Sequence, residues 1–191
     1  MSFYPHKPFA GQKIQGVVGT TPCDEAFIAH ETIANAALGS TLTVHATITI
    51  GATAQDLAAT LQPVVARNIV CTGNASTDEA IVITGKDVSG AVITETFTLS
   101  GTNAQTGTNA FKSVTNIHVP VVSAGSTVAI VYGNKLGLIN KISGAGKLIS
   151  LSDGTADAGT LATSATVLAA NTYTPAATLN GALDFDIYYL V

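Results

Sequence analysis

The sequence is poor in charge and has no tryptophan. Only 10% of its residues are charged, whereas an average chain carries about 25%. The eight basic residues stand singly in a chain of net charge −4, so the basic patch typical of nucleic-acid-binding proteins is absent and no nucleic-acid partner is expected. The lack of tryptophan disfavours a carbohydrate-binding module, because such modules use exposed aromatic platforms.

Long apolar runs are also missing. None approaches the roughly 18 residues of a membrane helix, and the opening MSFYPHKPFAGQ lacks the apolar core of a secretion signal. Yet 47% of the residues are hydrophobic, and the mean hydropathy is +0.40. We therefore expect a soluble protein with no membrane partner, whose surface is buried against other subunits of an assembly.

Cysteine is scarce as well. Cys23 and Cys71 are far apart and show neither CxxC nor histidine spacing. They are predicted to be free, half-buried thiols and not a disulfide or a metal site.

The clearest pattern is a hairpin from Ala80 to Leu99. Its first arm is β-branched, and its second alternates apolar and threonine positions with the period of two that a pleated strand imposes. Between the arms, Asp87 favours an Asx-type turn and Gly90 a positive φ angle. The remaining chain repeats short strand patterns, predicted at 42–50, 67–73, 111–119, 126–133, 147–151, 160–170 and 184–191, with Asn180-Gly181 as a hairpin-turn signal before the last.

This rhythm predicts an all-β fold, an antiparallel sandwich or barrel of jelly-roll type with an extended N-terminal arm. The arm is residues 1–23, which hold Phe3, Tyr4 and Phe9 without periodicity and no acid before Asp24. Such a segment cannot fold alone. It is either a disordered terminus or an arm that lays its aromatic side chains on a neighbouring subunit.

Residues 24–65 form a lead-in of strand and helix, and residues 66–191 form the main β domain. In the lead-in, Asp24 could cap a short helix that Gly39 closes. Residues 54–61 could make a helical turn.

The sequence contains none of the catalytic motifs considered. No serine lies in a Gly-x-Ser-x-Gly elbow, and Gly144-Ala145-Gly146-Lys147 lacks the first glycine and the final hydroxyl of a phosphate loop. His30-Glu31 would need a second histidine at Ala34 to hold zinc. Asp153, Gly154 and Asp157 lack the dense oxygen ligands of a calcium loop. We expect neither catalysis nor a cofactor.

Glu95 is the unusual charged residue, because it lies in the apolar stripe of Ile93, Phe97 and Leu99. A carboxylate that enters a core must be paired or protonated. We expect a structural ion pair within the chain, with Arg67 and Lys112 as candidate partners, or an ion pair between subunits. Otherwise the stripe is interfacial. In the last strand, Phe185, Ile187, Tyr189 and Val191 share one face, so this strand is expected to be tied into a sheet of its own chain or of a neighbour.

Several stretches resemble a known family. They are ARNIVCTG, AIVITGKDVSGAVITETFTLSG, FKSVTNIHVP and YGNKLGLI, together with the last strand and its Tyr188 and Tyr189. The chain resembles tailed-bacteriophage virion proteins that include capsid decoration, or cement, proteins, over Ala66 to Ile139 with an echo at Asp184 to Val191. The resemblance implies a β protein, made in the host cytoplasm, that binds the major capsid protein on the outside of the shell, usually as a homotrimer. A tail, fibre or baseplate component is the alternative, and a carbohydrate-binding module is a third.

Overall fold

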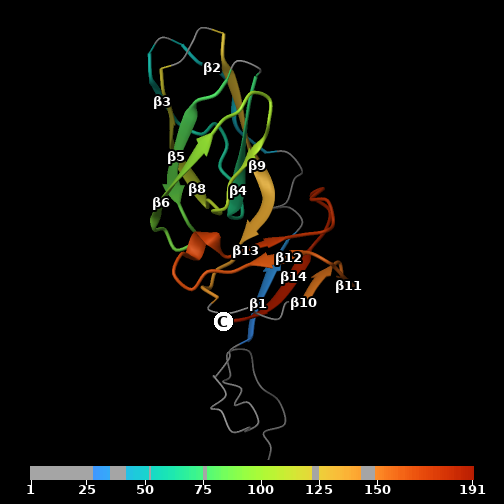
Figure 1. Cartoon of the computed structure of the whole chain (residues 1–191). Coiled ribbons are helices and arrows are strands. Elements are labelled where there is room, and N and C mark those ends of the chain that lie inside the picture. Colours follow the sequence, from blue (N-terminus) through green and yellow to red (C-terminus); the bar gives the residue numbers. More distant parts are fainter. Residues whose placement is uncertain (1–27, 35–41, 52, 75–76, 122–124, 143–148) are drawn as a thin grey trace, which may run out of the picture.

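The computed structural model describes residues 28–34, 42–51, 53–74, 77–121, 125–142 and 149–191 (Figure 1). The predicted arm, with Phe3, Tyr4 and Phe9, lies outside these residues. Regular structure in the described part is almost entirely β. Its elements are β1 (Ile28–Ile33), β2 (Thr43–Thr49), β3 (Gln55–Leu57), β4 (Arg67–Gly73), β5 (Ala80–Lys86), β6 (Val92–Thr98), β7 (Gln105–Thr106), β8 (Ser113–Val119), β9 (Thr127–Gly137), β10 (Ile149–Ser152), β11 (Thr155–Ala156), β12 (Thr160–Ala162), the 3₁₀ helix η2 (Leu168–Ala170), β13 (Thr172–Thr174) and β14 (Phe185–Leu190).

The strands form three antiparallel sheets, which confirms the predicted all-β class. The hairpin sheet has the order β3-β8-β5-β6, and the terminal sheet has the order β1-β14-β10-β11. Between them, the central sheet runs β12-β13-β9-β4-β7, with β2 also paired to β9.

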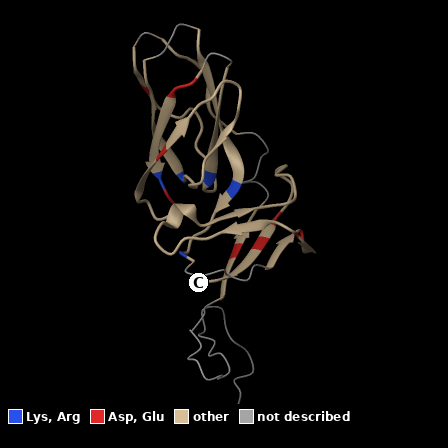
Figure 2. Cartoon of the chain, viewed as in Figure 1, with Lys and Arg blue, Asp and Glu red and all other residues tan. Residues whose placement is uncertain are grey.

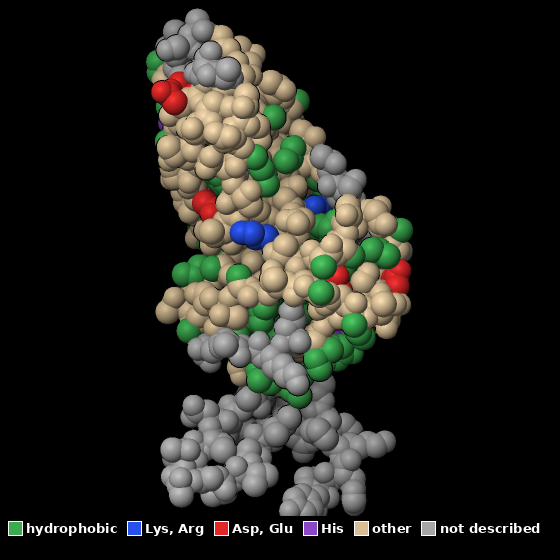
Figure 3. All heavy atoms as spheres, turned by 45° about the vertical axis from the view of Figure 1, so that its right-hand side comes forward, with side chains coloured by type: hydrophobic (Ala, Val, Ile, Leu, Met, Phe, Trp, Pro, Cys, Tyr) green, Lys and Arg blue, Asp and Glu red, His purple; other side chains and the backbone are tan. Residues whose placement is uncertain are grey.

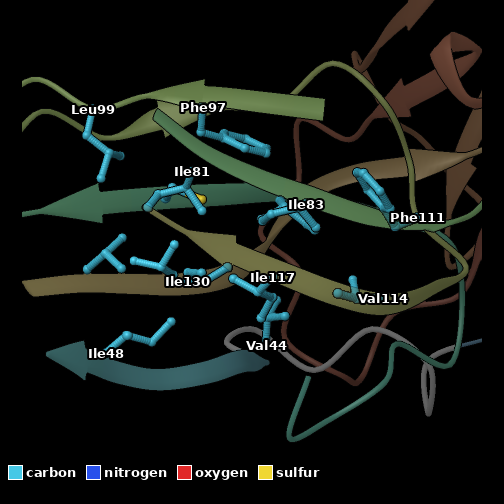
Figure 4. Packing of buried hydrophobic residues seen from close by; sticks show 14 of the residues in the cluster. Val44, Ile48, Ile81, Ile83, Phe97, Leu99, Phe111, Val114, Ile117 and Ile130 are labelled. Atoms are coloured by element: carbon cyan, nitrogen blue, oxygen red, sulfur yellow. The ribbon is translucent and has the colours of Figure 1, made fainter. Parts of the chain in front are cut away.

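Two hydrophobic cores result from this arrangement. The upper core lies between the hairpin sheet and the central sheet, and Figure 4 shows isoleucine, valine and phenylalanine side chains from both sheets meeting there. The lower core joins the far end of the central sheet to the terminal sheet through Leu136, Tyr173, Phe185 and Ile187. We call the two parts the upper and lower lobes, and Figure 1 shows them one above the other.

Strand β9 belongs to both lobes. Its Val128, Ile130 and Tyr132 are buried in the upper core, whereas Leu136 is buried in the lower one. One edge of β9 pairs with β4, and the other edge pairs first with β2 and then with β13. One continuous strand therefore connects the two cores.

A bulge in β9 marks the change between lobes. Ile69 pairs with Tyr132, but Arg67 pairs with Leu136, so Asn68 alone faces the extra residues 133–135. Such an insertion bends the strand and increases its local twist. The bulge thus allows one strand to leave the upper core and enter the lower.

Side chains of β4 fill this bulge. Asn68 is fully buried; its Oδ1 accepts from Lys135 N at 2.9 Å, and its Nδ2 donates to Gly107 O at 3.2 Å. Arg67 Nε donates to Gly133 O at 2.7 Å. Backbone groups that lose their ladder partners at the bulge are in this way satisfied by side chains.

The predicted central hairpin is confirmed. Strands β5 and β6 pair from Ala80 opposite Thr98 to Lys86 opposite Val92. In the turn, Asp87 Oδ1 accepts from Ser89 N at 2.9 Å, and Gly90 has a φ of +86°.

Both helical predictions are wrong for the described residues. Residues 28–33 form β1 and pair with β14, and Gln55–Leu57 form β3 and pair with β8. Tertiary pairing overrides the local helix signals here. Asp24 and Gly39 lie outside the described residues.

The end of the chain also departs from expectation. Gly181 has a φ of +75° and Ala182 N donates to Asn180 Oδ1, so a turn exists. It does not close a hairpin, because β13 and β14 belong to different sheets. The strand predicted at 160–170 is shorter, since it splits into β12 and η2.

Gly133→Ala should destabilise the protein. An added Cβ would lie 2.4 Å from Asn68 Oδ1, and this amide is hydrogen-bonded and buried, so it cannot move freely. We expect a loss of about 2 kcal/mol in the free energy of unfolding, typical of overpacking, measured by urea denaturation. Gly51→Ala is the control, because its Cβ meets no atom within 4 Å. Equal stability of the two variants would contradict the role of Asn68 in the bulge.

Candidate functional site

Strand β14 is the central element of the lower lobe's outer surface. Its side chains alternate as the sequence predicts: Phe185, Ile187 and Tyr189 are buried, whereas Tyr188 and Leu190 are only partly buried. The strand lies between β1 and β10, so it is tied into a sheet of its own chain. The candidate residues Tyr188 and Tyr189 therefore point to opposite sides of the sheet.

The outward side chains of three strands form an apolar surface. Ile28 lies opposite Leu190, and Ile149 lies opposite Tyr188. The exposed fraction is 43% for Ile28 and 53% for Ile149. Together with Tyr189 these residues line a shallow pocket of about 130 Å³. We call this surface the terminal-sheet face, and Figure 3 shows hydrophobic side chains gathered on the lower lobe.

A polar cluster adjoins this apolar surface. The His30 ring stacks on Tyr188, with parallel planes and centroids 4.2 Å apart. His30 Nε2 lies 3.0 Å from Asp186 Oδ1, and Thr32 Oγ1 donates to the same oxygen at 2.6 Å. The hydrogen bonds from Thr32 and then from His30 lower the pKa of Asp186 below its usual value. The face therefore carries an ionised carboxylate at neutral pH.

The inner side of the sheet is fastened to the end of β9. Tyr189 donates its hydroxyl hydrogen to Glu31 Oε1, which also accepts from Ile139 N at 2.9 Å. Asn140 Nδ2 donates to the Tyr189 oxygen at 3.1 Å. Burial raises the pKa of Glu31, although both hydrogen bonds oppose that change. These hydrogen bonds attach the inner side of the terminal sheet to the segment that follows β9.

Within the chain Glu95 does not pair with Arg67 or Lys112, so the predicted ion pair within the chain is wrong. The carboxylate accepts instead from Thr108 N at 2.7 Å, Thr108 Oγ1 at 2.9 Å and Asn109 N at 3.4 Å. Backbone N–H groups satisfy a carboxylate as a cation would. Glu95 thus fastens the loop that follows β7.

The two cations bind backbone carbonyl groups. Arg67 is 1% exposed and donates to Gly133 O, and burial lowers the pKa of its guanidinium. Lys112 Nζ donates to Val64 O. Arg67 also borders an open pocket of about 290 Å³, lined mainly by residues 131–134 and 175–179. None of these contacts assembles a nucleophile with a base.

The other residues considered for chemistry have structural partners. Cys71 is a free thiol, as predicted, but it is fully buried and not half-buried, and burial raises its pKa, as in an unreactive cysteine. Cys23 lies outside the described residues. Asp153 and Gly154 form the turn between β10 and β11 with φ values of +47° and +75°. Asp157 accepts from the Tyr173 hydroxyl and from Ala177 N. No cluster of metal-ligating side chains occurs within the described residues.

Comparison of the chain with protein-family models, with curated proteins and with solved structures finds no match in any of the three. In the described part of the chain, no helix is long and apolar enough to cross a membrane. The terminal-sheet face is therefore the candidate site on its geometry alone.

Sequence reasoning named Tyr188 but missed Ile28, His30 and Ile149. The available signal was the period-two alternation of IAHETI, in which Ile28, His30 and Thr32 share the outward side. The helix-capping residues on either side of this segment concealed it.

Glu95→Ala should destabilise the fold by about 2 kcal/mol, because two backbone N–H groups lose a charged acceptor. Glu95→Gln retains an oxygen that can accept from Thr108, so its loss of unfolding free energy should be smaller. Chemical denaturation of both variants measures the difference. A loss below about 0.5 kcal/mol for Glu95→Ala would show that these hydrogen bonds contribute nothing to stability.

Asp186→Asn should weaken the acid sensitivity of the fold. The pKa of Asp186 is lower in the folded than in the unfolded chain, so its stabilising contribution is present above the unfolded pKa and is lost as pH falls through the folded one. As the pH is lowered from about 5 to about 2, the Tm of the variant should fall less than the Tm of the wild type.

Glu31→Gln is the matched comparison, with the opposite sign. The pKa of Glu31 is raised, so its contribution is complete below the unfolded pKa and is lost as pH rises through the folded one. Glu31→Gln should remove that loss. Parallel pH profiles of Tm for both variants and wild type would contradict the opposite pKa shifts assigned to Asp186 and Glu31.

Proposed function

We propose that this protein is a non-enzymatic virion subunit that decorates the outer surface of a phage capsid and stabilises the shell. The observation that carries the proposal is the terminal-sheet face, an apolar surface on a sheet that is hydrogen-bonded to the segment that follows β9. Apolar side chains that cluster in this way on one side of a sheet are a candidate interaction site in a folded protein. Its partners are the major capsid protein and further copies of the chain, as a homotrimer.

The family resemblance supports the proposal through its position in the fold. The stretch Ala66 to Ile139 corresponds to β4 through β9, which include the strand shared by both lobes and, together with β2 and β3, build the upper lobe. The echo at Asp184 to Val191 corresponds to β14, the strand from which the terminal-sheet face is built. The resembling residues therefore include both the framework and the candidate interface.

A decoration protein acts by mass action. It binds the assembled shell and not the separated shell subunits, so its occupancy raises the stability of the shell. At a free concentration a hundredfold above the dissociation constant, each site contributes about 2.7 kcal/mol. Many equivalent sites add their contributions, and no chemical step is required of the protein.

Capsids prepared without the protein should rupture at a lower temperature than decorated capsids, and adding the protein back should restore the higher temperature. Dye release from heated particles measures this. The variant Ile149→Asp, which places a charge in the terminal-sheet face, should restore little of the rupture temperature. Val92→Asp should act as wild type, because Val92 is a comparably exposed apolar residue, 69% exposed, on the hairpin sheet.

Stripped and decorated shells that rupture at the same temperature would refute the proposal. Localisation of the protein to the tail alone, by immunogold labelling of virions, would favour the tail, fibre or baseplate alternative.

A further inference from the structure

We infer that the terminal-sheet face is covered by the N-terminal arm, residues 1–23, of a second copy of the chain. This inference deepens the proposed function, on which it rests, by naming the partner of the same face. It follows from the chemistry of the face, the composition of the arm and the point at which the chain enters the sheet.

The face combines apolar surface with negative charge. Its pocket is lined by Ile28, Ile149, Tyr188, Tyr189 and Leu190, and the Asp186 carboxylate lies on the same side of the sheet as Tyr188. The four strands of the terminal sheet contain no lysine or arginine. Asp184 and Asp153 are exposed at the start of β14, at the other end of that strand from the pocket. Figure 2 shows acidic residues on this sheet, with the basic residues mostly at the lower end of the upper lobe. A fitting partner is apolar and cationic.

The arm has this composition. It contains Phe3, Tyr4 and Phe9, and its only charged side chains are Lys7 and Lys13, since no acidic residue precedes Asp24. Aromatic side chains bury a large area at low conformational cost, and lysine is attracted to a carboxylate. The arm is therefore complementary to the face in both respects.

The length of the arm and its point of entry allow it to reach a second copy. Ile28 begins β1, which is an edge strand of the terminal sheet in the described part, and lies opposite Leu190 at the rim of the face. The stretch between Phe9 and Ile28 spans up to about 60 Å when extended. Three adjacent strands of the face measure only about 10 Å across. The arm is thus long enough to pass its own face and reach that of a neighbour.

Photo-crosslinking of the full chain tests the inference. Phe9 is replaced by p-benzoylphenylalanine, equal amounts of ¹⁵N-labelled and unlabelled chain are mixed and allowed to assemble, and crosslinked peptides are identified by mass spectrometry. We expect crosslinks from position 9 to peptides that contain β14 or β10, in pairs that join a labelled to an unlabelled chain. Crosslinks confined to pairs of one isotope would assign the face to the chain's own arm. The absence of crosslinks to these strands would overturn the inference.

Sedimentation velocity of two variants gives an independent measure. Ile149→Thr removes apolar surface from the face and should raise the dissociation constant of self-association about tenfold. Val92→Thr is the matched control on the hairpin sheet and should leave it unchanged. Equal constants for Ile149→Thr and wild type would contradict the inference.

The outcomes separate this inference from the proposed function. Isotope-mixed crosslinks in a protein that leaves capsid rupture unchanged would support the arm contact and refute the capsid role. Capsid stabilisation without isotope-mixed crosslinks would support the capsid role and refute the arm contact.

Discussion

The buried amide of Asn68 holds together the place where the two lobes meet. Its oxygen accepts from the bulge of β9, and its nitrogen donates to the loop that follows β7. Because Gly133 has no Cβ, this amide can lie directly against the bulge. Unpaired backbone groups in such a place would each cost roughly 1–3 kcal/mol. The alignment of the upper and lower cores therefore depends on one side chain and on one missing Cβ.

Glu95 acts on the same loop from its other side. The carboxylate accepts from Thr108 and Asn109 next to Gly107, where a Cβ would lie 2.7 Å from Glu95 Oε2. The loop is thus clamped between Asn68 and Glu95. The charged Glu95 in an apolar stripe therefore anchors a loop. The sequence suggested an ion pair because the actual partners are backbone N–H groups, which no residue type identifies.

The sequence predicts those elements whose signal is local. The hairpin β5–β6 and the strands β2, β4, β8 and β14 carry period-two alternation or β-branched runs, and all were placed correctly. Strand β1 was not, because capping residues around it favour a helix locally, whereas its pairing partner β14 lies at the other end of the sequence. The split of the fold into two cores was also hidden, since the sequence predicts the end of a strand at Gly133-Asn134, whereas the structure makes it a bulge through which β9 continues to Gly137.

The candidate site shows the same limit. Tyr188 and Tyr189 were identified from one strand, but the face needs Ile28 and Ile149, which approach Tyr188 and Leu190 only through the register of three strands. Sequence alternation indicates which side chains share a face of one strand. It does not indicate which strands are neighbours.

The central position of β14 has a consequence for synthesis of the protein. The ribosome delivers β1 first, but its partner is complete only once Leu190 has been made. Until then the inward residues of β1 and β10 have no strand between them, and the lower core is open. The upper lobe, whose strands end at Gly137, can fold earlier. A nascent chain therefore has no terminal-sheet face until β14 has been made.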